Sequence, residues 1–91
     1  MDAIVTGSAG LIGAETVRFL VGKGMDILGI DNNLREYFFG SDASTEWSRR
    51  QLEQRFRNSY QHKNIDIRDY ENLEKVFKCY GNMVKLVVHT A

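Results

Sequence analysis

Three glycines spaced three residues apart, Gly7, Gly10 and Gly13, are the residues whose type and spacing most directly suggest chemistry. They follow a short apolar run and precede an amphipathic one, so a strand, a glycine turn and a helix are expected in that order. Glycines in such a turn let a pyrophosphate approach the backbone and let the helix pack closely against the strand. The N–H groups at the helix start, near Leu11 and Ile12, would then face the phosphate charge.

A carboxylate follows the glycines at the spacing expected for a nucleotide site. Residues 26–30 form a second apolar run, and Asp31 closes it about 20 residues beyond the glycines, where a carboxylate accepts hydrogen bonds from an adenosine ribose. The pattern is T-G-x-x-G-x-x-G, so it lacks the Gly-Lys-Ser/Thr ending of an NTPase loop. The alternative, a glycine-rich turn beside an unrelated solvated Asp31, needs separate explanations for the turn, the helix and the acid.

The elements that must position these residues alternate between strand and helix. Right-handed crossovers between the strands predict a parallel sheet in the order 3-2-1-4 with βαβαβαβ topology. This is a three-layer α/β half-Rossmann fold, expected to form a single domain over residues 1–91. The pattern predicts strands at 2–6, 26–30, 60–64 or 65, and 85–89, and helices from 10 or 11 to 22, from 44 or 45 to 57, and from 70 to 80.

Composition argues against several classes of partner. Twelve basic and 12 acidic residues without a like-charge block predict neither a nucleic-acid nor a membrane partner. No apolar run approaches the length of about 20 residues that spans a membrane, and a strand directly after Met1 leaves no room for a signal peptide. The single cysteine, Cys79, is expected to be buried and inert. Because one cysteine cannot form a disulfide framework, a cytoplasmic location is expected. No metal-ligand spacing is present, so no metal site is expected.

Apolar spacing also predicts which helix faces are buried. The first helix is expected to bury a broad side, and Trp47, Leu52 and Phe56 are expected to form the stripe of the second. Four arginines on the second helix could form an anion site, although a solvated helix face is the favoured interpretation. The first helix's predicted buried residues are Leu11, Ile12, Val17, Phe19, Leu20 and Val21, and the arginines are Arg49, Arg50, Arg55 and Arg57.

Taken together, these motifs resemble those of the extended short-chain dehydrogenase/reductase superfamily, in particular its NAD-dependent epimerase/dehydratase family, which acts on nucleotide sugars. The resemblance extends over essentially all 91 residues and corresponds to the amino-terminal third or less of a full-length member. It rests on residues 6–13, Asp31-Asn32-Asn33, residues 66–69 and Val88-His89-Thr90-Ala91. The segment from Asp31 to Trp47 looks most like the CDP-paratose 2-epimerase (CDP-tyvelose epimerase) branch.

The resemblance implies NAD as the cofactor and assigns its parts to residues. An acid at position 31 would also disfavour the 2′-phosphate of NADP by charge repulsion. For Asp66 the alternative is that it only turns the chain before the next helix, and His89 is expected to be hydrogen-bonded rather than catalytic. By resemblance, the pyrophosphate would lie on Gly7, Gly10, Leu11, Ile12 and Gly13, and the ribose hydroxyls would bind Asp31. Asn32 and Asn33 would lie by the ribose and adenine, and Asp66 and Ile67 would border the adenine edge. Thr90 and Ala91 would lie along the rest of the cofactor.

Hydride chemistry is not expected from this chain alone. The family's catalytic pair is a tyrosine followed four residues later by a lysine, and no tyrosine here has a lysine at that spacing. No catalytic residue is therefore assigned, and a nucleotide sugar is expected as substrate only in a full-length relative. We expect a piece that binds the adenosine-diphosphate half of NAD weakly.

The alternative function, from a different class, is a non-enzymatic module that associates with itself. The predicted strand 85–89 would present an unpaired apolar edge, which is a template for pairing with another chain. A homodimer through this strand and the neighbouring uncovered sheet face is the simplest closed arrangement.

Overall fold

The sheet has the predicted strand order. A computed structural model describes residues 1–32 and 46–90. Within these residues, four parallel strands form one sheet in the order β3-β2-β1-β4, and strands alternate with helices throughout. The predicted fold class and topology are therefore confirmed. The strands are β1 (Ala3–Thr6), β2 (Ile27–Asp31), β3 (Tyr60–Asn64) and β4 (Leu86–His89).

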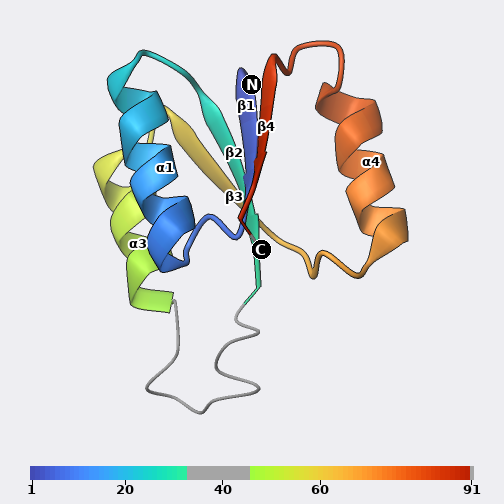
Figure 1. The fold of residues 1–91 in the computed structure, drawn as a ribbon, viewed down its shortest axis with the longest axis horizontal. Helices are drawn as coiled ribbons and strands as arrows, with labels where there is room; N and C mark the ends of the chain where they lie inside the picture. Colours follow the sequence, from blue (N-terminus) through green and yellow to red (C-terminus); the bar gives the residue numbers. More distant parts are fainter. Residues whose placement is uncertain (33–45, 91) are drawn as a thin grey trace.

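Helices cover both faces of this sheet (Figure 1). Helices α1 (Leu11–Gly22) and α3 (Glu46–Arg55) lie on one face, and α4 (Tyr70–Tyr80) lies on the other. Asp69 caps the start of α4, because its carboxylate accepts the backbone N–H of Asn72 at 3.3 Å. Positions 44 and 45, where the sequence predicts that the preceding helix begins, lie outside the described residues.

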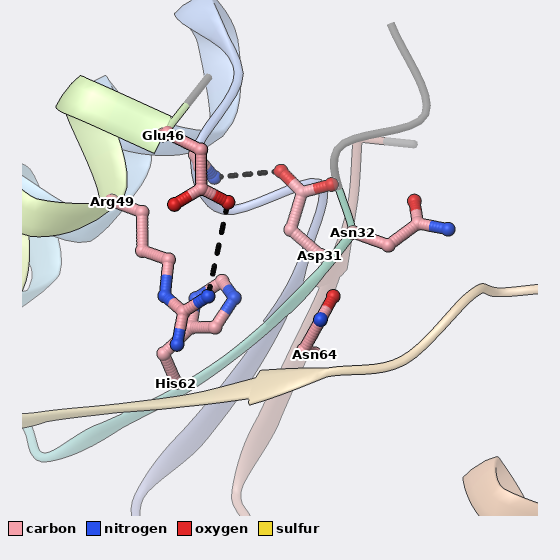
Figure 2. Close-up of a pocket in the computed structure, with 7 residues that line it drawn as sticks. Asp31, Asn32, Glu46, Arg49, His62 and Asn64 are labelled. Atoms are coloured by element: carbon pink, nitrogen blue, oxygen red, sulfur yellow. Dashed lines mark hydrogen bonds and ion pairs between the residues drawn. The ribbon is translucent and has the colours of Figure 1, made fainter. Parts of the chain in front are cut away.

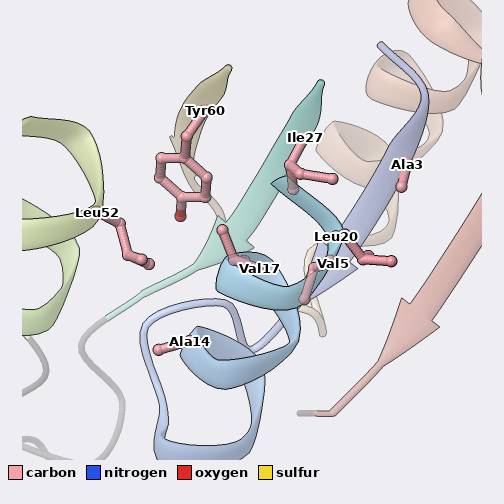
Figure 3. Packing of buried hydrophobic residues seen from close by; sticks show 8 residues of the cluster. All are labelled: Ala3, Val5, Ala14, Val17, Leu20, Ile27, Leu52 and Tyr60. Carbon is pink, nitrogen blue, oxygen red and sulfur yellow. The ribbon is translucent and has the colours of Figure 1, made fainter. Parts of the chain in front are cut away.

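Two apolar cores form, one on each face of the sheet. Successive residues of a strand point to opposite faces, so β1 supplies Val5 to one core and Ile4 to the other. The second core lies under α4 and contains Ile4, Leu28, Ile30 and Val76. The first, under α1 and α3, contains Ala3, Val5, Ala14, Val17, Leu20, Ile27, Leu52 and Tyr60 (Figure 3).

The predicted breadth of the buried helix faces is wrong. Leu11 is 84% exposed, and Ile12 and Phe19 are also largely exposed. Helix α1 instead buries a narrow stripe, in which Val17 and Leu20 follow the adjacent pair Gly13 and Ala14 at helical spacing. In α3, Trp47 is exposed because it lies five residues before the buried Leu52, about 140° away around the helix.

Helix α4 covers the sheet through a similarly narrow contact. Val76 is buried, and Leu73 and Tyr80 pack partly against the same core. Cys79 is exposed, which contradicts the predicted burial of its thiol. Phe77, on the same helix, is 39% exposed.

Strand β4 lies at an edge of the sheet. Among the described strands it pairs only with β1, through a register that places Thr6 beside His89. Leu86 and Val87 are 40% and 48% exposed, so this apolar run is not covered on both faces by the described residues. The edge predicted from the sequence is therefore present in the described structure.

Candidate functional site

The glycine turn joins β1 to α1, and its shape depends on two of its glycines. Gly7 has a φ of +71°, in the left-handed region that favours glycine, and its N–H donates to the Ile30 carbonyl at 2.7 Å. The Gly10 N–H donates a hydrogen bond to the Gly7 carbonyl at 3.0 Å. A Cβ at Gly13 would overlap that same carbonyl, so only glycine lets α1 approach the turn this closely. Gly7 therefore forms the tight turn, and Gly13 allows the close packing of helix against strand that the sequence predicts.

The start of α1 is open to an anion. Gly10 caps the helix in an extended conformation without a side-chain hydrogen bond, and no acidic residue lies in the first turn. The first N–H groups of a helix have no partner within it, and they carry the positive end of its dipole. Leu11 and Ile12, which supply two of these groups, are exposed. The helix start therefore offers donors to a negatively charged group.

Asp31 ends β2 next to this turn. Its Oδ2 accepts the Ala9 backbone N–H at 2.9 Å, which joins the strand end directly to the glycine turn. Burial raises the pKa of the Asp31 carboxyl, and the backbone N–H groups of Ala9 and Asn32 oppose that shift. The carboxylate is thus partly desolvated and still bound to backbone donors.

A small, open hollow adjoins Asp31, between the strand ends and α3 (Figure 2). The Arg49 side chain lies in this hollow between two acids. Its Nη1 is 3.9 Å from Glu46 Oε1, and its Nε is 2.6 Å from Glu53 Oε1. The Asn32 side chain points away from α3. The residues lining the hollow are Ala9, Asp31, Asn32, Glu46, Arg49, His62 and Asn64.

The last described residue, Thr90, is tied to the turn from the other side. The Thr90 hydroxyl donates to the Thr6 carbonyl at 2.7 Å, and the Thr90 N–H donates to the same oxygen at 3.1 Å. The preceding His89 shares a hydrogen bond of 2.6 Å between its Nδ1 and the Thr6 hydroxyl, so it is hydrogen-bonded as predicted, although it is exposed. The ends of β1, β2 and β4 therefore converge on the glycine turn.

Residues 4–91 match the family described as GDP-mannose 4,6 dehydratase. The chain belongs to this family. A UDP-glucose 4-epimerase from Caenorhabditis elegans is 32% identical over 91 residues, covering 100% of this chain and 26% of the relative. No solved structure matches the chain.

The match concerns the first part of a family domain. The chain corresponds to the amino-terminal portion of an NAD-dependent epimerase/dehydratase domain and spans about a quarter of the curated relative's length. Members of this epimerase/dehydratase family use NAD(P). The coarser resemblance stated from the motifs is therefore confirmed.

Asp66, which the family resemblance assigns to the adenine edge, is held by a near neighbour. Both carboxylate oxygens bind the Arg68 side chain, with Nη2 to Oδ2 at 2.6 Å, and Oδ1 accepts the Arg68 backbone N–H. The Arg68 side chain and then its backbone N–H lower the pKa of Asp66 to about 2, and the Asn32 side chain assists. These bonds support the alternative in which Asp66 turns the chain, while the Asn32 contact places it beside the end of β2.

Some predicted site residues fall elsewhere. Ile67 is half-buried just beyond β3, near Asp66, and Asn33 and Ala91 lie outside the described residues. Their predicted contacts with a nucleotide stay predictions.

Two residues of β3 lie at the candidate site beside Asp31, although the sequence did not predict them there. His62 and Asn64 line the hollow because the β2–β3 register places them opposite Gly29 and Asp31. Burial, followed by the nearby Arg49 charge, lowers the pKa of His62. Their spacing of two residues on a strand is a signal that they share a face, but the face can be assigned only once the register is known.

The described residues contain neither a metal-binding cluster nor a membrane-spanning helix. No group of three or more His, Cys, Asp or Glu side chains is placed to hold a metal ion. No described helix has the length and apolar character that crossing a membrane requires.

Proposed function

We propose that this chain binds the adenosine-diphosphate half of NAD at the glycine turn and Asp31. The observation that carries the proposal is the bond between the Ala9 N–H and Asp31 Oδ2, because it holds a phosphate-type turn and a ribose-type carboxylate as one unit. The pyrophosphate would lie over Gly10 and the N–H groups of Leu11 and Ile12. The ribose hydroxyls would donate to the Asp31 carboxylate.

The surroundings of Asp31 support a preference for NAD over NADP. A ribose 2′-phosphate at this point would meet the Asp31 carboxylate, and Glu46 adds a second carboxylate to the same hollow. Arg49 is the cation among the described residues that line the hollow, and its side chain is already paired with Glu46 and Glu53. Asn32, Asn33, Asp66 and Ile67 would lie by the ribose and adenine, and Thr90 and Ala91 along the rest of the cofactor.

In this proposal, only longer relatives catalyse the hydride transfer. When bound, NAD accepts and returns a hydride, and that transfer needs a base for the substrate hydroxyl. The sequence has no Tyr-x-x-x-Lys pair, so the 91-residue chain would bind the cofactor without epimerase or dehydratase turnover. A nucleotide sugar would be the substrate of the full-length form, and the CDP-paratose 2-epimerase branch is the narrower specificity that we propose.

Calorimetric titration with ADP-ribose tests this binding. We expect a Kd of about 0.1–1 mM, since the contacts to the nicotinamide half are missing. Gly10→Val should abolish the heat signal by placing a side chain where the pyrophosphate would lie. Gly22→Val is the matched control, because a Cβ at Gly22 meets no atom within 4 Å. Equal binding by the wild type and a folded Gly10→Val variant would contradict the site.

We also propose a second candidate function, self-association through β4. The exposed Leu86 and Val87 lie on a strand whose outer edge has no partner among the described residues, and such edges pair with other chains. Light scattering across a dilution series should then show a homodimer. The Val87→Lys variant should instead be an unfolded monomer or an aggregate. A compact monomer at micromolar concentration would contradict this second function and leave the first intact.

A further inference from the structure

A buried chain of side-chain hydrogen bonds runs beneath the glycine turn. The Ser8 hydroxyl lies 2.8 Å from the Tyr60 hydroxyl, which in turn lies 3.0 Å from His62 Nδ1. Ser8 is 0% exposed and Tyr60 is 3% exposed, although 52 residues separate them. These hydrogen bonds therefore connect the turn after β1 to β3, at the opposite edge of the sheet from β4.

Gly29 makes room for this connection. It lies on β2, between β1 and β3, with Val5 beside it on one strand and His62 on the other. A Cβ on Gly29 would overlap the Tyr60 hydroxyl and would also crowd the Ser8 hydroxyl. The missing side chain thus leaves the space in which the Tyr60 and Ser8 hydroxyls meet.

The Tyr60 ring and its hydroxyl have separable roles. The ring packs in the core with Val17, Ile27 and Leu52. The hydroxyl is buried with the rest of the side chain, and this burial raises the pKa of Tyr60 to about 12, so it stays protonated and able to donate. Removing the hydroxyl alone would preserve the packing and leave the Ser8 hydroxyl buried without this partner.

We infer that the Tyr60 hydroxyl is a positioning group for the nucleotide turn, acting through Ser8. Ser8 directly follows Gly7, whose positive φ sets the turn, and it precedes the Ala9 N–H that binds Asp31. Anchoring the Ser8 side chain from below restricts the backbone on both sides of it. The turn is then held in the shape that presents its N–H groups, a role that rests on the proposed binding of ADP.

The first test needs no ligand. In Tyr60→Phe, amide hydrogen exchange at the Gly10 N–H, which bonds the Gly7 carbonyl, should accelerate about five- to tenfold relative to the amides of β1. Tyr70→Phe is the matched control, since Tyr70 is 74% exposed on α4 and should leave the turn unchanged. Equal acceleration in the turn and β1, or no change at Gly10, would show that Tyr60 only stabilises the core and would overturn the inference.

The second test measures ADP-ribose affinity by calorimetry. Tyr60→Phe and Ser8→Ala should each weaken binding about three- to tenfold, and the double variant should lose less than the product of the two single losses. Unchanged affinity in Tyr60→Phe, with a wild type that binds, would overturn the positioning role and leave the proposed function standing. If the wild type does not bind ADP-ribose, the proposed function fails, and the exchange result alone decides whether Tyr60 positions the turn.

Discussion

The Ala9 backbone N–H donates to Asp31 Oδ2 at 2.9 Å, so the glycine turn and the end of β2 are one hydrogen-bonded unit. This bond has two consequences for nucleotide binding. It fixes the Asp31 carboxylate relative to the start of α1, and it places that carboxylate beside the N–H groups that would bind the pyrophosphate. Changes at Asp31 should therefore affect ligand selectivity, stability and pH dependence together.

Replacing Asp31 should reduce the preference for NAD over NADP. Asp31→Ala removes the ribose acceptor and the repulsion of a 2′-phosphate, so NAD affinity should fall about tenfold or more while NADP affinity changes little. Asp31→Asn is the matched variant, because its amide oxygen can still accept from Ala9 while the charge is gone. Competitive calorimetry with both cofactors measures the change. Stronger wild-type binding of NADP than of NAD would contradict the role of Asp31.

Asp31 should also link stability to pH. Because burial raises its pKa in the folded chain, the folded state holds this proton more tightly than the unfolded state does. Its stabilising contribution is present below the unfolded pKa of about 3.9 and is lost as the pH rises through the raised value. Asp31→Asn should therefore unfold at higher urea concentration than the wild type at neutral pH, with a gain that shrinks on acidification. A gain that is independent of pH would contradict this explanation.

His62 should act in the opposite direction. Burial and the Arg49 charge lower its pKa, so the folded chain binds this proton less tightly than the unfolded chain. The stability contribution is complete above the unfolded pKa of about 6.5 and is lost as the pH falls through the lowered folded value. His62→Gln should flatten the urea-unfolding profile over that range. An unchanged slope would mean that His62 titrates equally in both states.

Gly13 should tolerate no side chain. A Cβ there overlaps the Gly7 carbonyl, so Gly13→Ala must displace α1 from the turn and should lower the free energy of unfolding by about 1–3 kcal/mol. Gly22→Ala is the control within the same helix, where a Cβ meets nothing within 4 Å and alanine should stabilise by about 0.5–1 kcal/mol. Urea unfolding measures both changes. A Gly13→Ala variant as stable as the wild type would contradict the close-packing role.

Much of the fold follows from short-range patterns in the sequence. Apolar runs separated by helical stretches predict the strands, and right-handed crossovers then restrict their order to 3-2-1-4. Asp31 could be placed near the turn because the carboxyl ends of adjacent parallel strands share one edge of the sheet. The position of Thr90, just beyond the carboxyl end of β4, follows from the same rule.

Features that depend on helix phase or strand register could not be predicted in this way. Phe19 and Trp47 are apolar but exposed, because contacts by small neighbours such as Ala14 and Ser48 set which face of each helix meets the sheet. The bond between Ser8 and Tyr60 depends on the β2–β3 register and on the absence of a side chain at Gly29, whose place the two hydroxyls take. No local pattern links residues so far apart in the chain.

Amide NMR during titration with ADP-ribose tests the central claim most directly. The account predicts saturable shifts at Gly10, Leu11 and Ile12 and around Asp31, with one dissociation constant of about 0.1–1 mM for all of them. Residues of α4 on the far face should serve as internal controls and stay unshifted. No shifts at millimolar ADP-ribose, or saturable shifts confined to α4 or β4, would contradict a nucleotide site at the glycine turn.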